Sequence, residues 1–104
     1  MDRSDVIKLV SVTTSQDERG ATRKVTNSRQ VFCSVDSVSS AEFFRARQEN
    51  LDATFKFVVF RYDYNGENLV EYNGEQYSIY RTYAPKSTDN IELYAERKAG
   101  TDGN

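Results

Sequence analysis

Few side chains in this sequence could carry out chemistry. The chain has no histidine, which removes the general base of a serine–histidine–aspartate triad and the most common metal ligand. Its single cysteine, Cys33, cannot form an internal disulfide or share a metal with a second cysteine. Because Cys33 lies in a strand-like run between Phe32 and Ser34 with no basic neighbour, we expect a packed, unreactive thiol rather than a nucleophile.

Carboxylates and glycines offer no catalytic centre either. Carboxylate-only catalysis is formally open, but acidic pairs spaced as D-x-D or E-x-x-E do not occur outside the turns and the tail. The glycines stand singly, so the chain lacks a glycine-rich loop that could cradle a phosphate. We therefore predict a protein that is not an enzyme and that uses no cofactor or metal.

A polar segment over residues 15–30 is the main candidate for binding a partner. It has no hydrophobic periodicity and a glycine, Gly20, near its middle, which predicts a long mobile loop or a flexible hairpin tip. The segment is either a solvated loop or a docking arm that contacts a partner ring or passing DNA. Across residues 17–30 the net charge is +2, from Arg19, Arg23, Lys24 and Arg29 against Asp17 and Glu18. This charge density is too low for tight nucleic-acid binding by itself.

Tyrosines form a second candidate surface. The chain contains seven tyrosines and six phenylalanines but no tryptophan, and a tyrosine tolerates a half-exposed position. Four of the tyrosines could stack on bases or sugars, as in an oligonucleotide-binding barrel: Tyr72, Tyr77, Tyr80 and Tyr83. Acidic side chains lie beside them with only Arg81 in balance: Glu67, Glu71 and Glu75. Because an acidic hairpin repels phosphate, core packing or protein contact is favoured over nucleic-acid binding.

Size and charge narrow the class of protein. A chain of 104 residues is expected to form one domain, residues 1–104, because each half would be too small for a core of its own. The net charge of −2 gives no basic field toward nucleic acid or anionic lipid. The N-terminal residues lack a signal-peptide cleavage site, and no apolar run is long enough to span a membrane. We therefore expect synthesis in the cytoplasm and no membrane partner.

Three runs of β-branched, aromatic or alternating residues predict strands in the first two-thirds of the chain. They cover residues 6–14, 31–38 and 53–64. In the third run Phe55, Phe57 and Val59 share one face, and Lys56, Val58 and Phe60 share the other.

Between the second and third strands the pattern changes to that of a helix. Ser39 as N-cap and Glu42 three residues later form a capping box, which predicts one short helix over about residues 40–49. Glu42 with Arg45 and Arg45 with Glu49 are helix-spaced ion pairs worth about 0.2–0.5 kcal/mol each. A helix this short is not stable alone and must pack on the sheet.

Asn73 and Gly74 predict a two-residue hairpin turn between alternating runs. This register pairs Tyr72 with Glu75 and Val70 with Tyr77. One face of the hairpin then carries Val70, Tyr72, Tyr77, Ile79 and Tyr83. The other face is polar except for Leu69, and a one-residue slip would mix the two sets.

The last strand is predicted in residues 90–97, with Ile91, Leu93 and Ala95 inward, and residues 98–104 read as a frayed, flexible tail. The total is a mainly β protein of about six strands, with one short helix inserted between strands two and three. A small β-barrel or sandwich with the helix covering one opening is the expected architecture.

Over roughly residues 5–97, the order of these elements resembles the head–tail joining family of tailed bacteriophages, the head-closure or stopper proteins. The matching pieces are Glu42 after a strand and small residues, the strand end at Arg61 and Tyr62, and the pattern Tyr-x-Gly-x-x-Tyr-x-Ile from Tyr72 to Ile79. The order and spacing of these pieces together carry the resemblance.

The resemblance implies a head–tail stopper-like barrel that joins the phage head to the tail as a virion component. It would be a monomer in isolation that adds as a ring beneath the portal or adaptor ring. That ring closes the DNA-filled capsid and receives the tail terminator and other tail proteins, with only passive contact to DNA in the channel. The implied ring-interface residues are Arg19, Gly20, Arg23, Lys24, Glu42 and Phe44. The alternative from a different class is a β-barrel module that binds an oligonucleotide or a carbohydrate.

Overall fold

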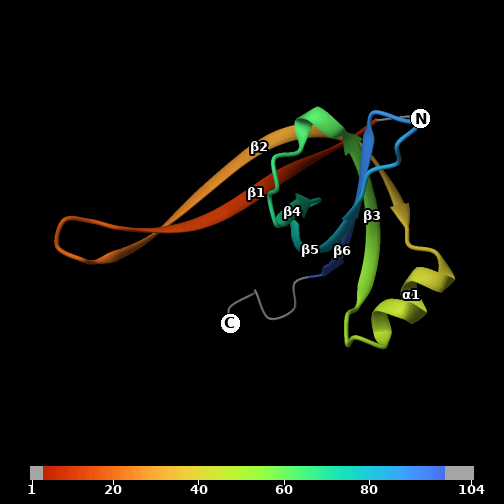
Figure 1. The fold of residues 1–104 in the computed structure, drawn as a ribbon, viewed down its shortest axis with the longest axis horizontal. Helices are drawn as coiled ribbons and strands as arrows, with labels where there is room; N and C mark the ends of the chain where they lie inside the picture. Colours follow the sequence, from red (N-terminus) through yellow and green to blue (C-terminus); the bar gives the residue numbers. More distant parts are fainter. Residues whose placement is uncertain (1–3, 98–104) are drawn as a thin grey trace.

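Alternating and β-branched runs form six antiparallel strands that close into a barrel in the computed structural model, which describes residues 4–97. The strands are β1 (Asp5–Gln16), β2 (Thr22–Ser37), β3 (Ala53–Phe60), β4 (Leu69–Tyr72), β5 (Glu75–Tyr83) and β6 (Asn90–Arg97). Around the barrel their order is β1-β2-β3-β6-β5-β4. Helix α1 (Ser40–Arg47) lies between β2 and β3, and a 3-10 helix, η1 (Arg61–Asp63), follows β3. The predicted fold class is confirmed (Figure 1). The predicted tail, residues 98–104, lies outside the described residues.

The barrel interior is filled by one alternate set of side chains from all six strands. The buried cluster comprises Ile7, Leu9, Val31, Cys33, Phe57, Val59, Val70, Tyr77, Leu93 and Ala95. Phe57 is fully buried, with ring centroids 5.6 Å from Tyr72 and 5.8 Å from Tyr77. The inward face predicted for β6 is therefore confirmed, and on β3 the face of Phe55, Phe57 and Val59 is the one that packs in the core. Cys33 is also fully buried, and burial, with the nearby Asp5 charge, raises the pKa of its thiol to about 12, as an unreactive core thiol requires.

The β4–β5 hairpin has the register that its turn predicts. Tyr72 pairs with Glu75 and Val70 with Tyr77. Asn73 and Gly74 have φ values of 52° and 80°, the left-handed pair that a type I′ turn needs to match the strand twist.

One part of the hairpin prediction was wrong. The ladder between β5 and β6 shifts between Ile79 and Arg81, so one extra residue changes which side chains face inward beyond that point. Ile79 packs against the core, whereas Tyr83 is exposed. Tyr83 therefore does not share the inner face of the hairpin.

The segment predicted as a mobile loop over residues 15–30 is mostly strand, so the loop reading was wrong and the hairpin reading is supported. β1 and β2 pair without irregularity from Asp5–Cys33 to Gln16–Thr22. The turn is confined to residues 17–21, where an Asp17 carboxylate oxygen accepts hydrogen bonds from the N–H groups of Arg19 (2.9 Å) and Ala21 (2.8 Å). Gly20 has φ 82°, the left-handed position after such a turn.

The outer part of this hairpin projects from the barrel as an arm, residues 11–28, here named the β1–β2 arm (Figure 1). β4 pairs with β1 only at residues 8–10, and β3 pairs with β2 only from Cys33 onward. All side chains from 12 to 28 are exposed. The arm makes the molecule elongated, with principal extents of 48 × 30 × 25 Å.

Helix α1 lies against the outer face of the barrel wall, not across an opening as expected. The side chain of Tyr94 alternates along β6 with the buried side chains of Leu93 and Ala95, so it points outward. Arg81 stacks on this outward ring and bonds to Glu42 of the helix. The helix ends two residues earlier than predicted. Asn50 adopts φ 63°, and the Leu51 N–H donates to the Ala46 carbonyl (3.0 Å), a left-handed C-terminal cap.

Candidate interaction surfaces

The β1–β2 arm carries four of the six sequence-predicted interface residues. Arg19 and Gly20 lie in its turn, and Arg23 and Lys24 lie in β2 opposite Ser15 and Thr14. Consecutive strand residues point to opposite faces, so the last two cations do not form one patch. All four residues are exposed.

The net charge of the arm is smaller than the +2 counted over residues 17–30, because Arg29 pairs with a barrel residue. Its guanidinium contacts the Glu67 carboxylate at 2.8 Å and 3.1 Å and also donates to the Asp63 carbonyl. The arm itself then holds Arg19, Arg23 and Lys24 against Asp17 and Glu18, a net charge of 3 − 2 = +1.

Glu67 is a buried carboxylate built into the connection between η1 and β4. It is 8% exposed, and it accepts a hydrogen bond from the Asn65 N–H at 2.9 Å. Tyr64 donates its hydroxyl to the Glu67 carbonyl at 2.7 Å. Burial alone would raise the pKa of Glu67, but the hydrogen bonds from Asn65 and Arg29 outweigh burial and leave that pKa below its ordinary value.

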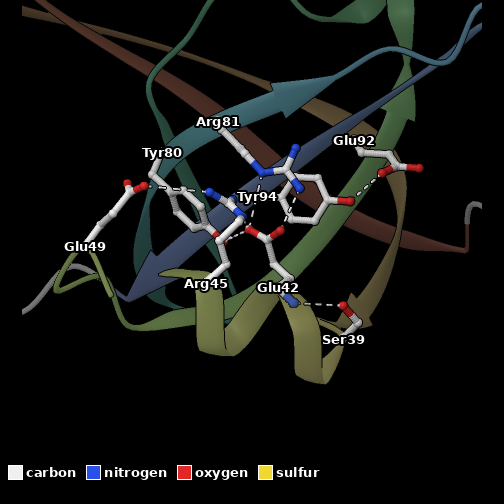
Figure 2. A network of polar contacts seen from close by, with 8 residues as sticks. All are labelled: Ser39, Glu42, Arg45, Glu49, Tyr80, Arg81, Glu92 and Tyr94. Atoms are coloured by element: carbon white, nitrogen blue, oxygen red, sulfur yellow. Dashed lines mark hydrogen bonds and ion pairs between the residues drawn. The ribbon is translucent and has the colours of Figure 1, made fainter. Parts of the chain in front are cut away.

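Helix α1 is held to the barrel by a network of polar contacts centred on Glu42 (Figure 2). This carboxylate is 6% exposed. It accepts hydrogen bonds from Arg81 (2.6 Å), from Arg45 (3.0 Å) and from the Tyr80 hydroxyl (2.5 Å). Arg81 also stacks over the Tyr94 ring at 3.9 Å from its centroid, a cation–π contact that fixes the guanidinium.

The bulge in β5 makes this network possible. In the shifted ladder Arg81 pairs with Tyr94, so it stands on the outer face beneath the helix, and the adjacent Tyr80 reaches the same carboxylate. The capping box is accordingly only half formed. The Ser39 hydroxyl accepts from the Glu42 N–H at 3.1 Å, while the Glu42 carboxylate turns to the barrel.

The Glu42 carboxylate is therefore occupied by contacts within the protein, and the exposed surface of α1 comes from the neighbouring phenylalanines. The Arg81 hydrogen bonds come first among the causes that hold the pKa of Glu42 at about 2, opposed by its burial. Phe44 is 65% exposed and meets Phe43 edge to face, with centroids 5.7 Å apart. Of the two predicted interface residues on α1, Phe44 is open to a partner, and Glu42 positions the helix that presents it.

A further exposed aromatic surface was not predicted. Val6 and Phe32 are cross-strand neighbours on the outer face of β1 and β2. Tyr62 is exposed too, and its ring lies 5.1 Å from that of Phe60 at the end of β3. The alternation in "VFCSV" could have indicated this surface. Val31 and Cys33 share the buried face, so Phe32 between them must point to the other face.

The tyrosine cluster expected from the sequence does not form one platform. Tyr77 is buried and Tyr72 packs against the core. Tyr80 is engaged with Glu42, and burial followed by this hydrogen bond raises the pKa of its hydroxyl. Of the four tyrosines, Tyr83 is the exposed one.

The acidic hairpin is likewise partly neutralised. Glu67 is buried against Arg29, and Glu75 pairs with Arg97 at 2.7 Å. Within residues 4–97 no group of three or more His, Cys, Asp or Glu side chains is placed to hold a metal ion. Nor does that part of the chain contain a helix long and apolar enough to cross a membrane.

The low pKa of Glu42 predicts a specific loss of stability in acid. Because the pKa falls from 4.5 to about 2 on folding, the carboxylate stabilises the fold fully above pH 5, and this contribution is lost as the pH falls toward 2. We expect on the order of 2 kcal/mol, after allowing for the solvent that reaches its arginine partners. Urea unfolding of the parent and Glu42→Gln proteins measures it. Their difference in free energy of unfolding should shrink over this range, and a constant difference would contradict the assignment.

Comparison with known proteins identifies the fold but no family. No family model matches the chain, and no curated protein matches it. The solution structure of protein SF1141 from Shigella flexneri 2a is similar, with a TM-score of 0.75 at 16% sequence identity. The similarity covers 92% of this chain and 93% of that one. At this identity the likeness establishes a shared fold alone.

Proposed function

We propose that this protein is a structural connector of a bacteriophage or prophage virion, which joins the head to the tail as a ring beneath the portal or its adaptor. The observation that carries the proposal is the β1–β2 arm, a long ordered ribbon that leaves the barrel and has exposed side chains on both faces. The element order that resembles the head–tail joining family supports it.

The physics of the arm favours a role in assembly. A two-stranded ribbon on its own is only marginally stable in water, and the free strand edges of such a ribbon can pair with another chain. Val12 and Val25 are exposed on it, on opposite faces of the ribbon. An arm of this kind can dock onto the neighbouring ring or project into the channel as a gate, and strand pairing there would add to its stability.

Exposed aromatic rings on the barrel fit the same role. Phe32, Phe44 and Tyr62 are each more than 60% exposed, and aromatic side chains are enriched where protein surfaces meet. A barrel that keeps these rings in fixed positions can repeat one contact around a ring. DNA would pass such a ring with passive contact only, because the arm carries a net charge of just +1 and the chain a net charge of −2.

A shortened arm tests the assembly role. Removing residues 13–16 and 22–25 takes four residues from each strand, so the turn at 17–21 is kept and the remaining pairs retain their faces. We expect particles carrying this variant to lose DNA retention or tail attachment by at least tenfold, measured as infectious titre and by electron microscopy.

The matched control for the shortened arm is Arg23→Gln with Lys24→Gln, which removes its strand charges at full length. If length and edge pairing matter most, the control should lose far less titre than the shortened arm. Shortened-arm particles that hold DNA and accept tails normally would rule the arm out as a docking or gating element.

The second candidate is an oligonucleotide- or carbohydrate-binding module, favoured by the exposed Phe32 and Tyr62 rings, which can stack on bases or sugars. Titration with single-stranded DNA and with oligosaccharides at physiological salt separates the two candidates. The connector predicts no saturable binding, whereas the module predicts saturation that Phe32→Ala weakens.

A further inference from the structure

The root of the β1–β2 arm coincides with a single charged contact to the barrel. The barrel ladder on β1 ends at Val10, which pairs with Leu69 of β4 on one side and Ser28 of β2 on the other. Arg29 is the next residue of β2, opposite Leu9. It therefore sits where the shared wall ends and the free ribbon begins.

The partner of Arg29 is held in place by hydrogen bonds within the barrel. The Asn65 N–H donates to the Glu67 carboxylate, and the Tyr64 hydroxyl donates to the Glu67 backbone carbonyl. Arg29 reaches this site with two nitrogen contacts to one carboxylate oxygen and donates to the Asp63 carbonyl besides. Because both nitrogens converge on one oxygen and the guanidinium also bonds to a second residue, its position relative to the barrel is fixed from two sides.

Little else can set the direction of the arm. Beyond Val10 the pairing begins with Ser11 and Asn27, and Val12 and Val25, which lie opposite threonines, are apolar. The side chains from 12 to 28 are exposed and so pack against no core. Because these side chains are already in water, the ribbon can bend at its root without uncovering a packed apolar surface.

We propose that Arg29 is a positioning residue, and that its contact with Glu67 and the Asp63 carbonyl is a latch that aims the β1–β2 arm relative to the barrel. Releasing the latch lets the arm swing while the barrel stays folded. This inference rests on the contacts at the arm root and is independent of the proposed head–tail role.

The test measures the arm direction directly. Nitroxide spin labels are attached at Glu18→Cys, in the arm turn, and at Thr82→Cys, an exposed position of β5. Cys33 is fully buried and stays unlabelled. Pulsed electron paramagnetic resonance then gives the distribution of distances in the otherwise native protein, with Arg29→Gln or Glu67→Gln added. Arg97→Gln, which removes the exposed pair with Glu75, is the matched control.

We expect one narrow distance distribution in the parent and the control, and at least a doubling of its width in Arg29→Gln and Glu67→Gln, with the near-ultraviolet circular dichroism of the barrel unchanged. Narrow distributions in both variants would overturn the proposal, as would a broad one in the parent. If Glu67→Gln unfolds, the distance distribution of Arg29→Gln alone is the test, because Arg29 is half-exposed and its replacement leaves no cavity in the core. Unfolding of the barrel in both variants would also overturn it, because the pair would then hold the barrel and not aim the arm.

Discussion

Glu42→Gln is expected to lower the free energy of unfolding by about 2–3 kcal/mol at pH 7. Removing one member of a buried ion pair leaves its partner charge uncompensated, which costs about 3–5 kcal/mol when both groups are buried. The cost is smaller here because the Arg81 and Arg45 side chains are 37% and 47% exposed. The Tyr80 hydroxyl also loses a charged acceptor. Urea unfolding monitored by circular dichroism measures the change.

Glu49→Gln is the matched control, because it makes the same substitution on the next turn of the chain. Glu49 is 64% exposed and lies 3.8 Å from Arg45, so we expect a loss of less than about 0.5 kcal/mol. Equal losses in the two variants would show that the Glu42 network does not hold α1 to the barrel.

Phe57→Ala is expected to cost about 4 kcal/mol, the largest effect of any single substitution considered. Phe57 is fully buried on β3, and its ring lies among Phe55, Tyr72 and Tyr77 with centroids 5.6–5.8 Å away. Truncation removes the transfer free energy of the ring and leaves a cavity that rigid strands cannot close. A domain of this kind has a total stability of about 5–15 kcal/mol, so the variant should unfold at much lower urea concentration.

Phe44→Ala is the control for that substitution, since it removes the same ring from an exposed position on α1. Its expected cost is below about 0.5 kcal/mol. If Phe57→Ala cost as little as Phe44→Ala, the closed aromatic core could not be the basis of the fold.

The parts of the fold that local chemistry dictates were predictable from sequence. The Asn73–Gly74 turn sets its own register, and the alternation in β6 indicates which face is buried. These elements depend on residues that are adjacent in sequence or paired across a two-residue turn, so tertiary context had little to change.

The strands of the β1–β2 arm were not predicted beyond Thr14, because this part of the chain lacks the usual strand signal. With both faces in water, its residues show no alternation, and hydrophobic periodicity cannot detect such a strand. The spacing of Asp17 and Gly20, an aspartate opening a turn and a glycine closing it, was the local clue to the hairpin.

The partners of Glu42 could not be found from sequence either. The capping box correctly placed Ser39 and Glu42 at the start of α1. However, the carboxylate is satisfied by Arg81, thirty-nine positions away, and that contact depends on a bulge in β5. A bulge is set by pairing with β6, and the alternation in "YSIYRTY" does not reveal it.

Native mass spectrometry with the portal–adaptor ring encoded in the same genome is the decisive test of the proposed role as one protomer of a connector ring. We expect the isolated chain to be a monomer and the preformed ring to gain one complete, fixed complement of chains. We also expect the shortened-arm variant to fail to add to the ring. A chain that never adds to the ring in stoichiometric amounts, yet saturates with an oligonucleotide or an oligosaccharide, would contradict it.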